Sequence, residues 1–219
     1  TLDAANGTIT LDEGIFVTGT IESDTVVNDG ATLAGSGTVS GSVTVNDGGI
    51  VSPGVSPGII GTGDLILNSG ATFVVEINTT TPGTGHDQLG VTGTVNLNGD
   101  AGAGSILDLQ VDVNFAATPL AEIILIDNDG TGDAVQPVAG PRFQGFNEGD
   151  TVVLNGSPFI FSYQGGDGND VTLTFVPPTV VFVDDDFAGT NNGDPVSNPN
   201  PFVTGEPDAT YGYDAFDNI

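Results

Sequence analysis

A four-residue signature recurs four times in the first third of the chain, and it limits the fold more than any other feature. Each copy opens with Leu or Val, continues with two polar residues and ends in Gly. The copies lie at residues 11–14, 27–30, 45–48 and 67–70, so their first residues are 16, 18 and 22 positions apart. Each copy is followed by a small or apolar run that is typical of a short β-strand.

This imperfect period of about 20 residues predicts a β-solenoid, in which each coil stacks on the previous one and pairs with it in parallel. One coil cannot bury its own apolar face, so such a fold requires repetition. The same alternation also fits an antiparallel sandwich, whose strands recur about every 8–12 residues. The similarity of whole coils favours the solenoid.

The composition supports an all-β fold. Val, Ile, Leu, Phe and Thr are abundant, and 34 Gly and 13 Pro provide turns without a collagen-like period. A polar stretch at residues 78–87 interrupts the repeat, and we expect a surface insertion there because it offers no apolar side chain to bury. Further strand-like runs follow at residues 88–91, 94–97, 106–111 and 123–126.

The repeat is lost towards the end of the chain. Strand-like runs at 151–154, 159–163 and 171–175 replace it, and Asn155-Gly156 between the first two is a strong hairpin signal. We therefore expect an antiparallel C-terminal cap that closes the open edge of the stack. The prolines at 177 and 178 then predict a domain boundary, with a repeat domain at 1–175 and an extended tail at 176–219 that leads into a following domain.

The charge balance is extreme, because 29 acidic residues face one Arg and no Lys, for a formal net charge of −28. Such a chain repels nucleic acid and anionic membranes, so neither is expected as a partner. Its carboxylates must be solvated, screened by salt or bridged by divalent cations. The absence of Cys excludes disulfides and thiolate metal sites. No apolar run reaches the length of a membrane span, so we expect no membrane insertion by this segment.

Several stretches together carry a family resemblance. They are the Gly-Gly-Ile-Val-Ser-Pro-Gly-Val-Ser-Pro-Gly-Ile-Ile run at 48–60, His86-Asp87-Gln88-Leu89, and the segments 124–130 and 161–173. In order and spacing, residues 27–175 resemble the autotransporter passenger-associated β-strand repeat. The resemblance implies a right-handed parallel β-helix in a large secreted or cell-surface bacterial protein, and it implies no reaction. Residues 180–219 resemble the opening of a pectin-lyase-like β-helix domain.

Three acidic groups are candidate calcium ligands, although no cofactor is required. Asp167 and Asp170 lie in a Gly-Gly-Asp-Gly-Asn-Asp segment close to the calcium nonapeptide pattern, for which a hairpin turn is the alternative. Asp127 and Asp129 lack the downstream glutamate of an EF-hand loop. The run of Asp184, Asp185 and Asp186 would gain from a bound cation, and a solvated charge run is its alternative.

No residue is expected to be catalytic. His86, the only histidine, lies beside Asp87 in the polar insertion, which predicts an incidental loop residue rather than half of a dyad. Arg142, between Pro141 and Phe143, is expected to anchor carboxylates at the cap.

These observations predict a non-enzymatic structural segment of an extracellular or cell-surface protein, such as a stalk, an adhesin arm or a subunit of a matrix fibre. Its expected partners are other surface proteins, extracellular polysaccharide or copies of itself. One alternative is an accessory module of a polysaccharide-degrading enzyme whose catalytic β-helix lies beyond Ile219. Another is assembly of chains triggered by calcium.

Overall fold

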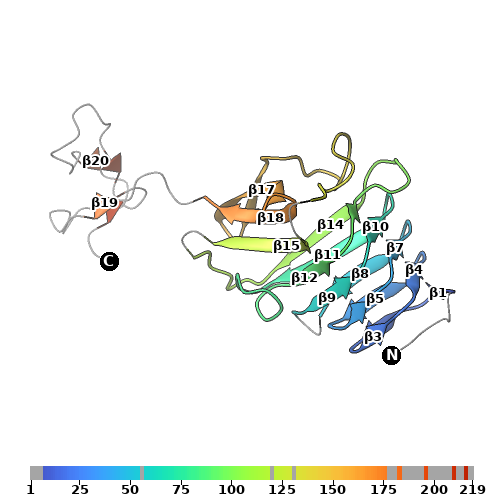
Figure 1. Cartoon of the computed structure of the whole chain (residues 1–219). Helices are drawn as coiled ribbons and strands as arrows, with labels where there is room; N and C mark the ends of the chain where they lie inside the picture. The colour runs from blue at the N-terminus through green and yellow to red at the C-terminus, as the bar shows by residue number, and fades with distance from the viewer. Residues whose placement is uncertain are drawn as a thin grey trace. The chain divides into compact units, whose positions relative to one another are not determined.

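The structure is a computed structural model that describes residues 7–54, 57–118, 121–129 and 132–176, together with the backbone of four short strands further along the chain. The chain forms two compact units, Thr1–Val176 and Pro177–Ile219. The described residues are all-β and contain no helix (Figure 1). Accordingly, the described part of the chain has no helix that is long and apolar enough to cross a membrane.

The described strands of the first unit form three sheets. The first holds β1 (Thr8–Leu11), β4 (Asp24–Val27), β7 (Val43–Val45), β10 (Leu65–Leu67) and β13 (Val95–Asn96). The second holds β2 (Ile15–Val17), β5 (Thr32–Gly35), β8 (Ile50–Pro53), β11 (Thr72–Ile77) and β14 (Ile106–Val111). The third begins with β3 (Thr20–Ile21), β6 (Thr38–Val39), β9 (Ile59–Thr62), β12 (Gln88–Val91) and β15 (Glu122–Asn128).

The chain visits these sheets in a fixed order, so neighbouring strands of one sheet are three strands apart in sequence. All neighbours from β1 to β15 in this scheme pair in parallel. Figure 1 shows β5, β8 and β11 of the second sheet side by side. The antiparallel sandwich is therefore not formed in this part of the chain. Parallel sheets of this kind are compatible with the β-solenoid expected from the repeat.

The four signatures mark the register of the first sheet. Their opening residues, Leu11, Val27, Val45 and Leu67, are direct partners in successive strands and point into the core. The glycines that close the last three signatures have φ values of 76°, 73° and 81°, which a residue with a side chain rarely adopts. Each signature thus ends a strand of the first sheet and turns the chain towards the second.

The second residues of the signatures form a ladder of side chains that runs from coil to coil. Asn28 Nδ2 donates to Asp12 Oδ1 (2.7 Å), Asn46 Nδ2 to Asn28 Oδ1 (2.9 Å), and Asn68 Nδ2 to Asn46 Oδ1 (2.9 Å). We call Asp12, Asn28, Asn46 and Asn68 the asparagine ladder. Its amides bond to the equivalent side chain one coil away, so the ladder is satisfied only when the coils are stacked in register.

The core is built from columns of side chains that repeat from strand to strand. In the second sheet, Leu33, Val51, Phe73 and Leu107 are successive partners, and in the third sheet Ile60, Leu89 and Ile126 are. All of them are buried. In β11 the intervening residues are more exposed, as alternation along a strand requires, whereas β12 and β15 each bury two consecutive residues.

The third sheet continues into an antiparallel cap made of β16 (Thr151–Leu154), β17 (Ser157–Gly165) and β18 (Asp170–Phe175). Strand β15 is the junction, because it pairs in parallel with β12 and antiparallel with β18. Asn155 (φ 46°) and Gly156 (φ 85°) turn the chain between β16 and β17. The expected hairpin corner and the expected change to antiparallel pairing are both confirmed.

In the second unit, the described backbone consists of two strand pairs. β19 (Phe182–Val183) pairs in parallel with β22 (Ala215–Phe216), and β20 (Pro195–Val196) pairs antiparallel with β21 (Ala209–Thr210). The predicted calcium ligands Asp184, Asp185 and Asp186 lie outside the described residues.

Candidate functional site

The structure brings some of the predicted calcium ligands together and leaves one apart. Asp170, at the start of β18, is buried and accepts a hydrogen bond from the backbone N–H of Asn128 at 2.8 Å. Burial raises the pKa of Asp170, and the negative charges of Asp127 and Asp167 raise it further, although the Asn128 N–H lowers it. Asp127 and Asp167 are exposed. Asp129, which follows β15, is also exposed and is not among the groups that shift the pKa of Asp170.

The geometry of this group is that of a turn. Gly165 and Asp170 are antiparallel partners, and Gly168 N–H donates to Gly165 O at 2.8 Å, so the Gly-rich segment closes the hairpin between β17 and β18. Among the described residues, no three or more His, Asp or Glu side chains are arranged to hold a metal ion. Calcium binding at Asp127, Asp167 and Asp170 therefore stays a prediction.

The expectation that residues 78–87 form a surface insertion was wrong for His86 and Asp87, because neither side chain lies on the surface. Both are 0 % exposed. His86 Nε2 lies 3.1 Å from the carbonyl oxygen of Ile124 in β15, so the insertion folds back onto the third sheet. Burial lowers the pKa of His86, and the carbonyl of Ile124 raises it less strongly. The sequence signal was misread because a polar segment can be buried when the fold supplies its hydrogen-bond partners.

The Asp87 carboxylate joins two segments that are far apart in the sequence. Its Oδ1 accepts the backbone N–H of Gly58 at 2.7 Å, and its Oδ2 accepts the backbone N–H of Glu76 at 2.9 Å. Burial raises the pKa of Asp87 to about 6, against the lowering effect of these two N–H groups, and the nearby charge of Glu76 adds to the rise. Asp87 therefore ties the Ser-Pro-Gly segment to β11.

The two glycines of that segment make the connection sterically feasible. A Cβ on Gly54 (φ 94°) would collide with the backbone nitrogen of Gly58, and a Cβ on Gly58 would collide with the Cα of Gly54. Only glycine allows this close approach of the two halves of the turn. Both His86 and Asp87 are enclosed by the fold, and Asp87 holds the turn in place whereas His86 contacts Ile124 of β15.

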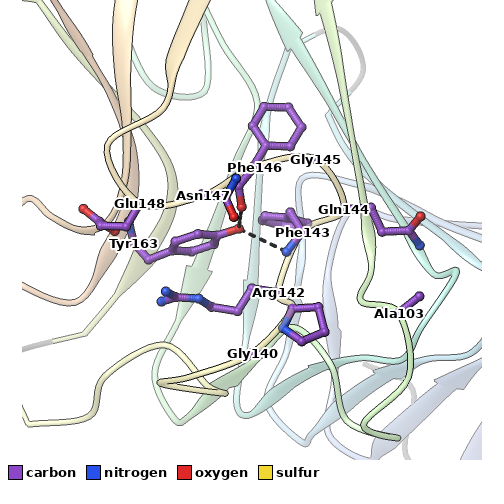
Figure 2. Close-up of a pocket in the computed structure, with 11 residues that line it drawn as sticks. Ala103, Gly140, Arg142, Phe143, Gln144, Gly145, Phe146, Asn147, Glu148 and Tyr163 are labelled. Atoms are coloured by element: carbon purple, nitrogen blue, oxygen red, sulfur yellow. Dashed lines mark hydrogen bonds between the residues drawn. The ribbon is translucent and has the colours of Figure 1, made fainter.

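A third feature, missed by the sequence reasoning, is a depression beside the cap. It encloses about 380 Å3 and lies between the loop that carries Arg142 to Glu148 and the Tyr163 ring of β17 (Figure 2). The guanidinium of Arg142 lies over this ring, 3.8 Å from its centroid, which is the geometry of a cation–π contact. No carboxylate of the described residues is paired with this guanidinium, so the expectation that Arg142 anchors carboxylates was wrong.

Two hydrogen bonds hold the hydroxyl of Tyr163. Its hydroxyl donates to the carbonyl oxygen of Phe146 (2.9 Å) and accepts the backbone N–H of Phe143 (3.0 Å), as the dashed lines in Figure 2 show. Burial raises the pKa of this hydroxyl to about 12, so it stays protonated at neutral pH. A buried aromatic anchor of this kind gives no signal in a single sequence.

A scan against protein-family models gives no match for this chain, and a search of curated proteins gives none either. The resemblances to the autotransporter passenger-associated repeat and to the pectin-lyase-like domain therefore stay predictions.

Proposed function

We propose that the chain is a right-handed parallel β-helix and serves as a non-enzymatic structural segment of a large secreted or cell-surface bacterial protein. The observation that carries this proposal is the register of the first sheet, where the four signatures are stacked and joined by the asparagine ladder. A stack of this kind transmits load along its length through backbone pairing, which suits a stalk, an adhesin arm or a fibre subunit.

The placement of the reactive side chains also supports a structural role. The only His–Asp neighbours in the sequence, His86 and Asp87, are buried and engaged with backbone groups. The high negative charge suits a solvated surface that meets other surface proteins, polysaccharide or copies of itself.

Activity measurements test the non-enzymatic part of the proposal. The purified chain is incubated with a panel of neutral and acidic polysaccharides, and new reducing ends are counted against a heat-denatured sample. We expect no difference between the two. Release of sugar ends by the native protein alone would contradict the proposal. The cell-surface location is tested separately by adding a protease to intact cells, and a protein that stays uncleaved there would contradict that location.

The alternative is an accessory module of a polysaccharide-degrading enzyme, favoured by the likeness of residues 180–219 to the opening of a pectin-lyase-like domain. The reading frame beyond Ile219 discriminates between the two proposals. Acidic residues recurring on successive coils there would support the enzyme, whereas their absence would remove it.

Calcium is proposed as an optional ligand that screens the acidic surface or joins chains through Asp127, Asp167 and Asp170. Melting temperature and particle size are compared in EDTA and in millimolar calcium, for the native chain and for Asp167→Asn. A rise in either quantity that the variant reduces supports the proposal, and identical values in both conditions contradict it.

A further inference from the structure

The single Arg or Lys side chain of this protein forms no ion pair with a carboxylate among the described residues. Arg142 is the only Arg or Lys among 219 residues with 29 acids, yet its guanidinium lies on the ring of Tyr163 rather than against a carboxylate. A guanidinium carries five N–H donors that lie in its own plane. The face of the Tyr163 ring offers no acceptor in that plane, so it uses none of these donors. Arg142, which lines the depression, therefore has N–H donors that meet no acceptor among the described residues.

The platform beneath the guanidinium is rigid. Tyr163 is 1 % exposed, and its ring is stacked on Phe143 with centroids 6.3 Å apart and packed edge-to-face on Phe161 at 4.7 Å. Its hydroxyl bonds to the backbone of the Arg142 loop at two points. The ring on which the guanidinium lies is thus held in place, and a fixed support of this kind reduces the ordering cost of binding.

The nearest acidic side chains are engaged by the protein. Glu148 Oε1 accepts from Ser162 Oγ (2.6 Å) and Glu148 Oε2 from the Tyr163 backbone N–H (2.7 Å). Asp150 Oδ2 accepts both the backbone N–H and the side-chain Nδ2 of Asn147, at 2.7 and 3.0 Å. Both carboxylates keep their negative charge, and Glu148 lines the depression as well, so Arg142 is the one lining group of opposite sign that can pair with an anion there.

Two exposed amides border the same depression and add polar contacts (Figure 2). Gln144 Nε2 donates to Gly104 O at 2.8 Å, which fixes the side chain and leaves its amide oxygen as an acceptor. Asn147 is fixed in the same way by Asp150, which leaves its own amide oxygen as an acceptor. These two acceptors line the same depression as Arg142, and they suit a ligand that carries hydroxyl groups as well as a carboxylate.

We propose that this depression binds an acidic saccharide through its carboxylate, which pairs with Arg142 while sugar hydroxyls donate to Gln144 and Asn147. A carboxylate and a guanidinium form paired, parallel hydrogen bonds that a neutral hydroxyl cannot reproduce. The volume of about 380 Å3 is in the range of small-molecule sites and accepts a sugar unit or two. The proposal does not depend on the structural role above, since a stalk and an enzyme module could each carry such a site.

The test uses the full chain and a short oligosaccharide of glucuronic acid, with the matching oligosaccharide of glucose as the neutral probe. Binding is measured by titration calorimetry and by chemical-shift changes. We expect the acidic probe to bind about tenfold more tightly than the neutral one, and Arg142→Gln to remove this preference. Arg142→Lys is expected to retain part of the preference, because it keeps the charge and loses the fork.

Gln110→Glu is the matched control, because it changes the net charge by the same amount on the exposed side of β14. We expect it to leave binding within about twofold, since surface charges beyond a Debye length are screened. The proposal is overturned if no binding occurs at millimolar probe, if Arg142→Gln binds as well as the native chain, or if both charge variants weaken binding equally. It is also overturned if a short Glu peptide binds more tightly than the saccharide, which would make an acidic protein segment the ligand. Melting curves of each variant confirm that it is folded.

Discussion

Two regions of the first unit bury their cores in different ways. In the parallel stack, strands β1 to β14, each buried side chain meets the equivalent side chain of the next coil, and most of these residues are Val, Leu or Ile. In the antiparallel cap, strands β16 to β18, aromatic rings make up half of the buried apolar side chains. Phe159, Phe161 and Tyr163 are enclosed together with Leu154, Val171 and Leu173. Both belong to one continuous apolar core.

The difference follows from what each region has to cover. A coil inside the stack has a similar coil on either side, so small branched side chains fill the space at every level. The last coil has no successor, and large rings cover more area per residue than aliphatic side chains do. The cap therefore closes the stack with fewer and larger groups, on which stability depends more heavily.

The largest expected effect comes from Phe161→Ala in the cap. Phe161 is 0 % exposed and packs on Phe146 and Tyr163, with ring centroids 5.1 and 4.7 Å away. Its truncation should lower the free energy of unfolding by about 3–5 kcal/mol, measured by urea denaturation. Phe16→Ala in β2 is the control, because Phe16 is 50 % exposed. Its truncation should lower the free energy of unfolding by less than about 1 kcal/mol. Equal losses in the two variants would remove the contrast between the regions.

A smaller effect is expected from the Ser-Pro-Gly turn of the stack. Gly54→Ala should lower the free energy of unfolding by about 3 kcal/mol, because it combines a left-handed backbone with a collision against the Gly58 nitrogen. Gly156→Ala in the cap hairpin has a similar φ, and nothing lies within 4 Å of its added Cβ. This variant should lower the free energy of unfolding by about 1 kcal/mol. The difference between the two variants then measures the close approach of Gly54 and Gly58 alone. Matching losses would show that no such close approach exists.

Asn46→Ala tests the asparagine ladder. Asn46 donates to Asn28 and accepts from Asn68, so the substitution breaks two side-chain bonds and leaves a half-buried donor and acceptor without partners. We expect a loss of about 1–2 kcal/mol by thermal denaturation. Asn114→Ala, whose exposed amide bonds only to Asp112, is expected to change stability by less than about 0.5 kcal/mol. If Asn46→Ala leaves stability unchanged, the asparagine ladder does not stabilise the stack.

The smallest effect is a pH dependence centred on Asp87. Its pKa in the folded chain, about 6, lies above the value of about 3.9 expected in the unfolded chain. The folded state then holds the proton more strongly, so the contribution of Asp87 to stability is lost as pH rises from about 4 to about 6. We expect this loss of stability to be absent in Asp87→Asn.

The pH experiment also compares the two regions. Asp170→Asn in the cap should remove a component of the same sign, since burial also raises the pKa of Asp170. Asp108→Asn, at an exposed position of β14, serves as a control with the same change in net charge. Melting temperatures between pH 4 and pH 7 are compared for all four proteins. If Asp87→Asn and Asp108→Asn show the same slope, Asp87 is not the titrating group.

Much of the architecture could be predicted from local sequence, and the reason is visible in the residues. The four signatures fix the register because a residue such as Val45 must lie beside Val27 and Leu67 to bury its side chain. Asn155-Gly156 specifies its hairpin through backbone angles that few other pairs adopt. In both cases the determining interaction is short in sequence or repeated at a regular interval.

The placement of polar side chains could not be predicted in the same way. His86 and Asp87 lie in a segment without apolar residues, yet Asp87 is buried because Gly58 and Glu76 supply backbone donors from distant positions. Arg142 was expected to meet a carboxylate, and instead the Tyr163 ring reaches it from β17. Each partner is brought by a different strand, so the pairing does not exist until the sheets are stacked.

The sequence by itself therefore determined an all-β chain with a regular stack and an antiparallel end, because apolar alternation and turn residues act over a few positions. Only the tertiary structure decided that the Ser-Pro-Gly turn is held by Asp87 and that Arg142 lies on the Tyr163 ring at the border of a depression. Burial and hydrogen bonding between distant segments decide those features, and a single chain written in order carries no record of which distant groups will meet.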